Sequence, residues 1–168
     1  MEMGKYSYGR PNIRWSNKDA KLIIGKYCSI ASNVNIYLGG NHNINHITTY
    51  PFGHIYNDIF KINNTKHPST RGDVIIGNDV WIADNVTIMS GVTINDGAVI
   101  CNNSHIVKDV MPYSLTGGNP AKHIKYRFSE EQIQKLLLIK WWDFPEEKLN
   151  KYLNLLCSEN IDDFINLF

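Results

Sequence analysis

The chain has 168 residues, of which 43% are hydrophobic and 20% charged, a composition typical of a single soluble globular domain. Its formal net charge of +1 argues against a protein that binds nucleic acids through a broad basic surface. No apolar run approaches membrane-spanning length, and the polar N-terminus lacks the apolar core of a secretory signal. We therefore expect a cytoplasmic protein without a membrane span.

Cysteines and histidines provide no sign of a disulfide framework or of a metal site. The three cysteines, Cys28, Cys101 and Cys157, include no C-x-x-C pair, and their odd number favours unpaired thiols in a reducing compartment. The six histidines do not have zinc-ligand spacing either. We therefore expect no bound metal.

The first part of the chain leads into a short repeat. Residues 1–21 are expected to be an irregular N-terminal segment, in which Ile13 and Trp15 could begin an imperfect coil. Residues 22–36 repeat with a period of six, with isoleucine at positions 24, 30 and 36. In a strand, residues i−2 and i share a face, so each unit directs two apolar side chains the same way. These residues predict about one coil of a solenoid.

Residues 37–73 interrupt the repeat, because the spacing from Ile36 to Ile76 is 40 residues and is not a multiple of six. The interruption is rich in aromatic residues and contains His42, His46, His54 and His67. Solenoids accommodate insertions as loops that project from one face, and long loops in compact domains are usually functional. We predict an ejected loop that carries the active site.

The period returns in residues 74–116. Isoleucine occupies every sixth position, and a small or branched residue lies two positions before each one. Turn-forming Asn, Asp and Gly residues separate these units. The isoleucines are Ile76, Ile82, Ile88, Ile94, Ile100 and Ile106. The pattern predicts very short strands wound around an apolar axis as a parallel β-helix, an all-β solenoid.

Residues 129–168 are predicted to be helical. Ser129 and Gln132 form a capping-box pattern, Pro145 suits a first helical position, and Asp162 could cap a short final helix. Because the exposed ends of a solenoid need cover, these helices are expected to cap its open end.

Several strings in the chain resemble the hexapeptide-repeat acetyltransferases. Gly39–His42 and Thr48–Phe52 (GGNH and TTYPF) are similar to the xenobiotic acetyltransferase branch, which includes chloramphenicol and streptogramin acetyltransferases. Gly77–Ile82, Gly117–Phe128 and Leu136–Leu149 match the same branch in the same order. The resemblance covers residues 22–165 and implies a left-handed β-helix, a homotrimer with side-by-side coils, and acetyl-CoA as co-substrate.

Within this resemblance, His42 is the catalytic base. Acetyl transfer from a thioester requires the acceptor hydroxyl to lose a proton as it attacks, and histidine has a pKa suited to that at neutral pH. Asn41, Tyr37, Tyr50 and Trp81 are candidate acceptor-binding residues. The alternative for His42 is a solvated loop residue, and His46 is its main rival. Phe52 could anchor the loop.

The orientation of Trp81 can be predicted from the repeat alone. Its neighbours Val80 and Ile82 point inward, so the indole must point out of the coil. It contacts either a second subunit, the loop or a ligand. Small residues on the coil faces suit pantetheine, and cations beyond the last coil suit the coenzyme phosphates. The candidate coenzyme-binding residues are Trp81, Ala83, Ser90, Gly91, Gly118, Asn119, Pro120, Lys122, Lys125 and Arg127.

The acceptor and the reaction class stay open at this point. Tyr6–Ile13 looks more like members that acetylate sugars of surface polysaccharides, so sugar and antibiotic hydroxyls compete as acceptors. N-acetylation of an amino sugar is an alternative. A catalytically inactive β-helix that serves as a scaffold or binding module is another, because fold does not fix function. A hexapeptide carbonic anhydrase would need a zinc site, for which His105 has no coil partner.

Overall fold

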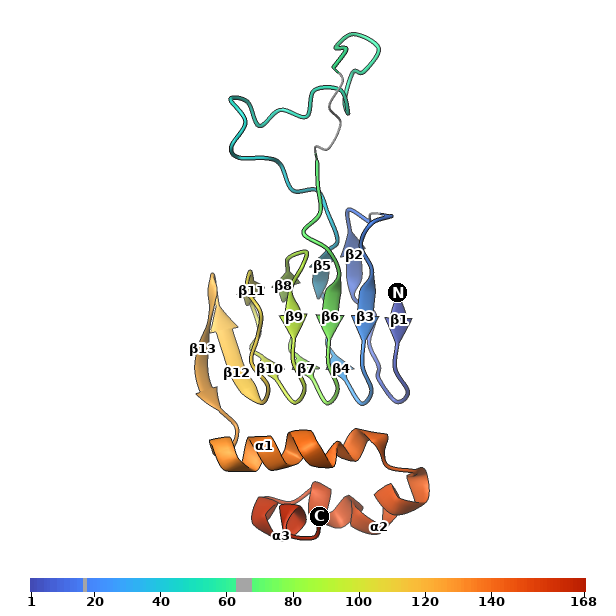
Figure 1. Ribbon diagram of the computed structural model, residues 1–168, viewed down its shortest axis with the longest axis vertical. Helices are drawn as coiled ribbons and strands as arrows, with labels where there is room; N and C mark the ends of the chain where they lie inside the picture. The colour runs from blue at the N-terminus through green and yellow to red at the C-terminus, as the bar shows by residue number, and fades with distance from the viewer. Residues whose placement is uncertain (17, 63–67) are drawn as a thin grey trace.

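The structure is a computed structural model that describes residues 1–16, 18–62 and 68–168. Short strands wind into a parallel solenoid, and three helices and a 3-10 turn follow it (Figure 1). The strands are β1 Glu2–Met3, β2 Asn12–Arg14, β3 Leu22–Ile24, β4 Ser29–Ile30, β5 Asn35–Tyr37, β6 Val74–Ile76, β7 Trp81–Ile82, β8 Thr87–Ile88, β9 Thr93–Ile94, β10 Val99–Ile100, β11 His105–Ile106, β12 Ser114–Gly118 and β13 Ala121–Tyr126.

The strands form three sheets, one for each side of the coil. The first sheet has the order β1-β3-β6-β9, the second β13-β12-β10-β7-β4 and the third β11-β8-β5-β2. All neighbours pair in parallel except β12 and β13, which form an antiparallel hairpin at the end of the second sheet. The parallel solenoid predicted from the period of six is confirmed; β13 was not predicted.

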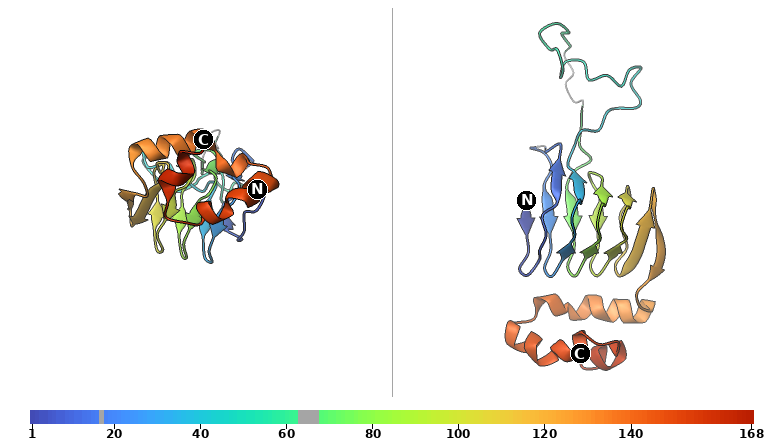
Figure 2. Two further views of the ribbon diagram at one scale, coloured as in Figure 1. Left: turned by 90° about the horizontal axis from the view of Figure 1, so that it is seen from below. Right: turned by 180° about the vertical axis from the view of Figure 1, so that it is seen from behind.

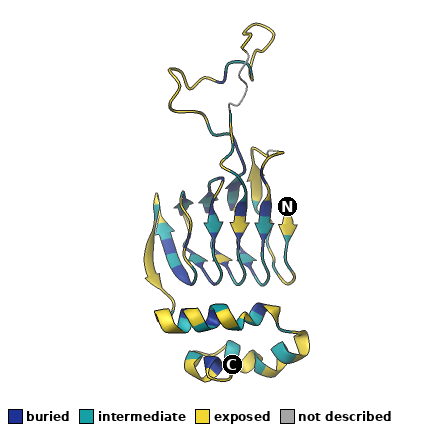
Figure 3. Cartoon of the chain, in the orientation of Figure 1, coloured by how far each residue is buried: buried dark blue, intermediate teal, exposed yellow. Residues whose placement is uncertain are grey.

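The isoleucines of the repeat stack in columns inside the coils. Ile24 pairs with Ile76 and Ile76 with Ile94, so successive coils place the same repeat position at the same point. The other two columns are Ile30, Ile82 and Ile100 in the second sheet, and Ile36, Ile88 and Ile106 in the third. Each of these side chains is no more than 3% exposed, as the colouring of Figure 3 illustrates. This column packing is the core of the solenoid.

Left-handed backbone conformations make the corners. Tyr27, Asp79, Gly97 and Tyr113 all have a φ between 52° and 69° and follow one another along the corner between the first and second sheets. A Cβ at Gly97 would lie 2.4 Å from the ring of Tyr113, so this position requires glycine. Two tyrosines at left-handed positions are unusual. We call this row of residues the aromatic corner.

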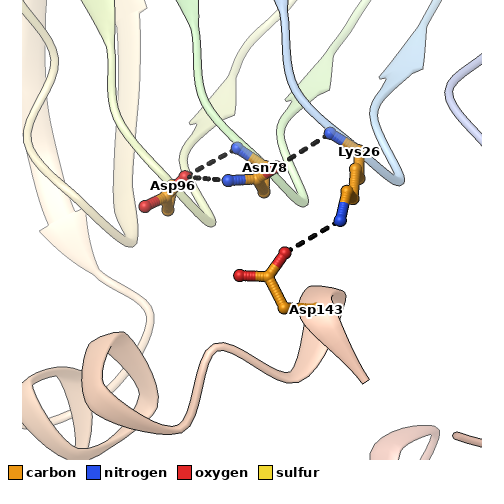
Figure 4. Close-up of polar contacts among 4 residues, drawn as sticks. All are labelled: Lys26, Asn78, Asp96 and Asp143. Carbon is orange, nitrogen blue, oxygen red and sulfur yellow. Dashed lines mark hydrogen bonds and ion pairs between the residues drawn. The ribbon is translucent and has the colours of Figure 1, made fainter. Parts of the chain in front are cut away.

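Side chains at the aromatic corner also bond one coil to the next (Figure 4). Asn78 donates its backbone N–H and its side-chain amide to Asp96 Oδ1, at 2.7 and 2.9 Å. Its own Oδ1 accepts the backbone N–H of Lys26 at 2.8 Å. Lys26 Nζ in turn lies 2.9 Å from Asp143, which belongs to the C-terminal helices.

The helical segments are α1 Glu130–Ile139, η1 Trp141–Asp143, α2 Glu146–Leu156 and α3 Ile161–Ile165. They lie along the aromatic corner and run the length of the solenoid, as Figures 1 and 2 show. Their apolar cluster includes Tyr27 from an early coil and Tyr113 from the last one. The expectation that they cover the open end is therefore wrong, because the aromatic side chains that receive them line a corner.

Details of the helix ends differ from the expectations by one or two residues. The capping box at Ser129 and Gln132 is present. Pro145 is the N-cap of α2 and lies just before its first turn. Asp162 lies inside α3, whose N-cap is Asn160, and it accepts a hydrogen bond from Gln132 instead.

The chain between β5 and β6 leaves the solenoid at the corner between the third and first sheets, away from the helices (Figure 1). We call residues 38–73 the projecting segment. His67 lies outside the described residues. Apolar side chains on the segment are highly exposed, including Ile44 at 82% and Ile59 at 66%. The solenoid nevertheless resumes in register, since Leu22 pairs directly with Val74.

Candidate active site

The base of the projecting segment is a short two-stranded neck. Asn41 and Ser69 exchange backbone hydrogen bonds of 3.0 and 2.8 Å. The side-chain amide of Asn41 donates to Ser90 Oγ at 2.7 Å, and the backbone N–H of Arg71 donates to the same oxygen at 3.3 Å. Gly91 donates its backbone N–H to the carbonyl of Gly72 at 3.1 Å. The turn after β8 therefore fixes both sides of the neck.

This arrangement specifies the roles of Asn41, Ser90 and Gly91. Ser90 is only 3% exposed and its hydroxyl holds the neck. A Cβ at Gly91 would lie 2.6 Å from the carbonyl oxygen of Arg71, so this glycine permits the close approach. The three residues predicted for substrate or coenzyme binding are thus positioned to support the residue that follows Asn41.

That residue is His42, whose side chain is exposed. Its Nδ1 lies 2.7 Å from the backbone carbonyl oxygen of Thr49. A carbonyl can only accept, so Nδ1 carries the proton and Nε2 is the basic nitrogen of the neutral ring. A hydrogen bond of this kind fixes both the tautomer and the orientation that a general base needs. Sequence reasoning did not assign this role to Thr49, although the TTYPF string contains it.

Aromatic rings gather on the same segment. Tyr50 and Phe52 have ring centroids 4.7 Å apart, and Phe60 packs edge-on against Phe52 at 5.0 Å. Tyr50 is 40% exposed, whereas Phe52 is half-buried. Phe52 thus packs within the segment, as an anchor does, and Tyr50 keeps a face open. Tyr37 is half-buried at the end of β5, where it pairs with Arg14.

Trp81 lies on a different side of the molecule. It is 55% exposed on the outer face of the second sheet, which confirms that its side chain points out of the coil. Cross-strand pairing aligns it with Val99, Val99 with Leu115, and Leu115 with Lys125. These four side chains therefore form one row across the second sheet.

Most of the remaining coenzyme candidates surround this row. Lys122 pairs with Gly117 and is exposed like Lys125, so both cations share the outer face of the second sheet with Trp81. Gly118 ends β12, and Asn119 and Pro120 form the turn to β13; all three are exposed. Ala83 follows β7 and is half-buried.

Arg127 is separate from these lysines. Its guanidinium donates to the carbonyl oxygen of Gly97 at 2.7 Å and lies 3.4 Å from Asp79 at the aromatic corner. It also stacks over the rings of Tyr113 and Phe128. Its contacts are thus those of a residue that joins the last strand to the helices.

A single chain does not bring the predicted residues together. His42 and Asn41 lie at the corner between the third and first sheets, whereas Trp81 and Lys125 lie on the second sheet, the side opposite that corner. Among the described residues, no cluster of three or more His, Cys, Asp or Glu side chains could hold a metal ion. No helix in the described ranges is long and apolar enough to cross a membrane.

Comparison with known proteins places the chain among acetyltransferases with hexapeptide repeats. A family model described as bacterial transferase hexapeptide (six repeats) matches residues 73–108. A probable macrolide acetyltransferase of Lysinibacillus sphaericus is 48% identical over 88% of this chain and 84% of its own length. A chloramphenicol acetyltransferase of Morganella morganii is 43% identical over 84% of this chain and 68% of its own.

Solved structures show the same solenoid. A galactoside acetyltransferase in complex with coenzyme A aligns with a TM-score of 0.53 at 26% identity, over 76% of this chain and 60% of the other. The chain therefore spans about three fifths of that solved relative, but most of the length of the macrolide relative. The repeat, together with the sequence identity to the two curated relatives, shows that the chain belongs to the hexapeptide-repeat acetyltransferases.

Proposed function

We propose that this chain transfers the acetyl group of acetyl-CoA directly to a hydroxyl group of a small acceptor, with His42 as general base. The observation that carries the proposal is the bond between His42 Nδ1 and the carbonyl of Thr49, because it assigns the ring proton to Nδ1 and makes Nε2 the basic nitrogen. As the acceptor oxygen attacks the thioester carbonyl, Nε2 takes the hydroxyl proton. The C–S bond then breaks, and coenzyme A leaves as a thiol with that proton.

The active site is proposed to form between subunits of a homotrimer of left-handed β-helices. Within one chain, the projecting segment and the row that contains Trp81 lie on different sides of the coil. The exposed isoleucines of the projecting segment would gain cover from a neighbouring subunit. Such an assembly would bring His42 of one subunit to the second sheet of another.

Acetyl-CoA is proposed to lie along that second sheet. Trp81 and Ala83 offer a flat face for the pantetheine arm, and the turn at Gly118–Pro120 borders it. Lys122 and Lys125 project from the same face and would attract the phosphates. Arg127 is a weaker candidate, since Asp79 and Gly97 already engage its guanidinium.

The acceptor is proposed to be an antibiotic of the kind that the curated relatives are named for, with a macrolide or chloramphenicol hydroxyl as first choice. The exposed face of Tyr50 and the neighbouring apolar side chains of the projecting segment favour an apolar acceptor over a free sugar.

The protein is proposed to act in the cytoplasm, where acetyl-CoA is available. The three cysteines are free, as expected in a reducing compartment.

The test is thiol release from acetyl-CoA with a macrolide, chloramphenicol, a streptogramin, galactose and glucosamine as acceptors. His42→Ala is expected to lower turnover by about 10²–10⁴-fold while coenzyme binding, measured by calorimetry, persists. His54→Ala is the matched control, because His54 is an exposed histidine of the same segment and should keep near-normal turnover. Near-normal turnover of His42→Ala would overturn the assignment, and failure to bind acetyl-CoA would favour an inactive scaffold.

A further inference from the structure

A cavity lies between the C-terminal helices and the aromatic corner, away from the projecting segment. Its volume is about 350 Å³, within the range of small-molecule sites. The cavity opens to solvent at a rim that includes Leu153 and Cys157.

Apolar side chains make up most of the wall. The helices contribute Leu136, Trp141, Leu153 and Phe164, and the solenoid corner contributes Tyr27. Such a lining suits the apolar body of a ligand.

A few polar groups converge where the solenoid forms the wall. Asp79 and Arg127 lie 3.4 Å apart as an ion pair, so their charges compensate each other. Tyr113 lines the same cavity and is only 1% exposed. Its hydroxyl is buried and has no hydrogen-bond partner among the described residues. Buried polar groups are almost always paired, so this orphaned hydroxyl indicates a missing partner.

The surroundings of Asp79 disfavour its charged form. Burial raises the pKa of Asp79 to about 6, although Arg127 acts in the opposite direction. Burial also raises the pKa of Tyr113, whose hydroxyl therefore stays neutral. The polar group of a ligand here would face a compensated ion pair and one neutral hydroxyl.

We propose that this cavity is a second ligand site, which binds an apolar molecule with a neutral hydroxyl or amide head that hydrogen-bonds to Tyr113. A charged head of either sign would lose its hydration against an apolar wall and meet no net opposite charge, since Asp79 and Arg127 already compensate each other. The site is separate from the proposed acetyl-transfer site, since none of the described residues of the projecting segment lines it. A ligand bound here stabilises the contact between the helices and the solenoid.

The test uses 2-naphthol, with naphthalene and 2-naphthoate as matched probes. Cys157 lines the cavity and is exposed, so the rate of its alkylation reports occupancy. The whole protein is treated with iodoacetamide without acetyl-CoA, so that no probe is acetylated. Mass spectrometry then separates Cys157 from Cys101, which lies elsewhere. We expect 2-naphthol to slow alkylation of Cys157 several-fold and to leave Cys101 unchanged.

Three variants test whether protection of Cys157 reports binding in this cavity. Tyr113→Phe removes an unpartnered hydroxyl and should fold normally. It is expected to bind 2-naphthol and naphthalene equally, whereas the natural protein prefers 2-naphthol about tenfold. Leu153→Trp fills the cavity from a residue that is 41% exposed and should abolish protection. His42→Ala should leave protection unchanged, which separates this site from the acetyl-transfer site.

Lack of protection by 2-naphthol at millimolar concentration would overturn the proposal. So would protection that survives Leu153→Trp, or equal or tighter binding of naphthalene or 2-naphthoate by the natural protein.

Discussion

Asn41 donates its side-chain amide to the hydroxyl of Ser90 over 2.7 Å, and this bond joins the projecting segment to the solenoid. Asn41 directly precedes His42, so the bond sets where the proposed catalytic base lies relative to the coils. Because Ser90 is buried in a corner turn, the rigid part of the molecule determines the position of a residue on a long segment.

Loss of this bond should affect catalysis more than stability. We expect Asn41→Ala to lower acetyl transfer about 10–100-fold, because a displaced base loses its reach to the acceptor. The free energy of unfolding should fall by only about 1 kcal/mol, the typical value of one hydrogen bond. Steady-state kinetics and urea unfolding of the same preparation check both values.

The matched control is Asn85→Ala. Asn85 donates to Asn103 over the same 2.7 Å, but at the corner between β7 and β8, away from the neck that carries His42. It should cost a similar amount of stability and leave turnover within about twofold. Equal loss of turnover in both variants would mean that Asn41 acts through general stability.

The pH dependence of stability should reveal Asp79. Burial raises its pKa in the folded chain to about 6, above the value of about 3.9 for an exposed aspartate. Between these values the folded chain holds a proton that the unfolded chain has released, so the stability that Asp79 contributes falls as pH rises from about 4 to about 6.

Asp79→Asn removes this titration. As pH rises from 4 to 7, the unfolding free energy of the variant should increase by about 1–2 kcal/mol relative to that of the natural protein. The increase is smaller than the full pKa shift implies, because the Asp79 side chain is partly exposed. Urea unfolding at several pH values measures the difference. A difference that is constant with pH, or that moves in favour of the natural protein as pH rises, would contradict the raised pKa.

The sequence was most informative where one residue type repeats at one spacing. The period of six predicted which side chains lie inside, because a strand separates its two faces by alternate residues, and Ile88 and Ile106 are buried as expected. The outward position of Trp81 followed from the same rule. The winding depends only on local turns, which explains why it could be predicted from sequence.

Contacts between distant segments were not predictable in this way. The bond from Asn41 to Ser90 depends on how the chain returns after residues 38–73, which no local pattern specifies. The position of the helices was misjudged because an amphipathic helix does not indicate which surface receives it. Tyr27 and Tyr113 at left-handed corner positions were the available signal, since large aromatic residues rarely occupy such turns.

Two neighbours in β6 test the packing of the core. Ile76 is 1% exposed inside the coil, whereas Ile75 is 40% exposed on the outer face of the first sheet. Ile76→Ala should lower the free energy of unfolding by about 2–5 kcal/mol, because it leaves a cavity in a packed column. Ile75→Ala should cost less than about 1 kcal/mol. Equal losses in urea unfolding would contradict the inside-outside alternation.

Asp96 tests the bonds that link successive coils at the aromatic corner. One of its carboxylate oxygens accepts both the backbone and the side-chain N–H of Asn78, as Figure 4 shows. Asp96→Ala leaves both donors without this acceptor and should cost about 1–3 kcal/mol. Asp96→Asn keeps a carbonyl oxygen and should cost less than about 1 kcal/mol.

The ranking of these two variants separates loss of the acceptor from loss of the charge. If the lost acceptor matters, urea unfolding should rank Asp96→Asn well above Asp96→Ala. If the lost charge matters, both variants should lose equal stability, and the effect should shrink in high salt because exposed charges are screened. The aromatic corner also supports the helices, so 2-naphthol should protect Cys157 from alkylation less well in Asp96→Ala than in Asp96→Asn. Equal stability of the two variants at all salt concentrations would show that the acceptor at this corner is dispensable.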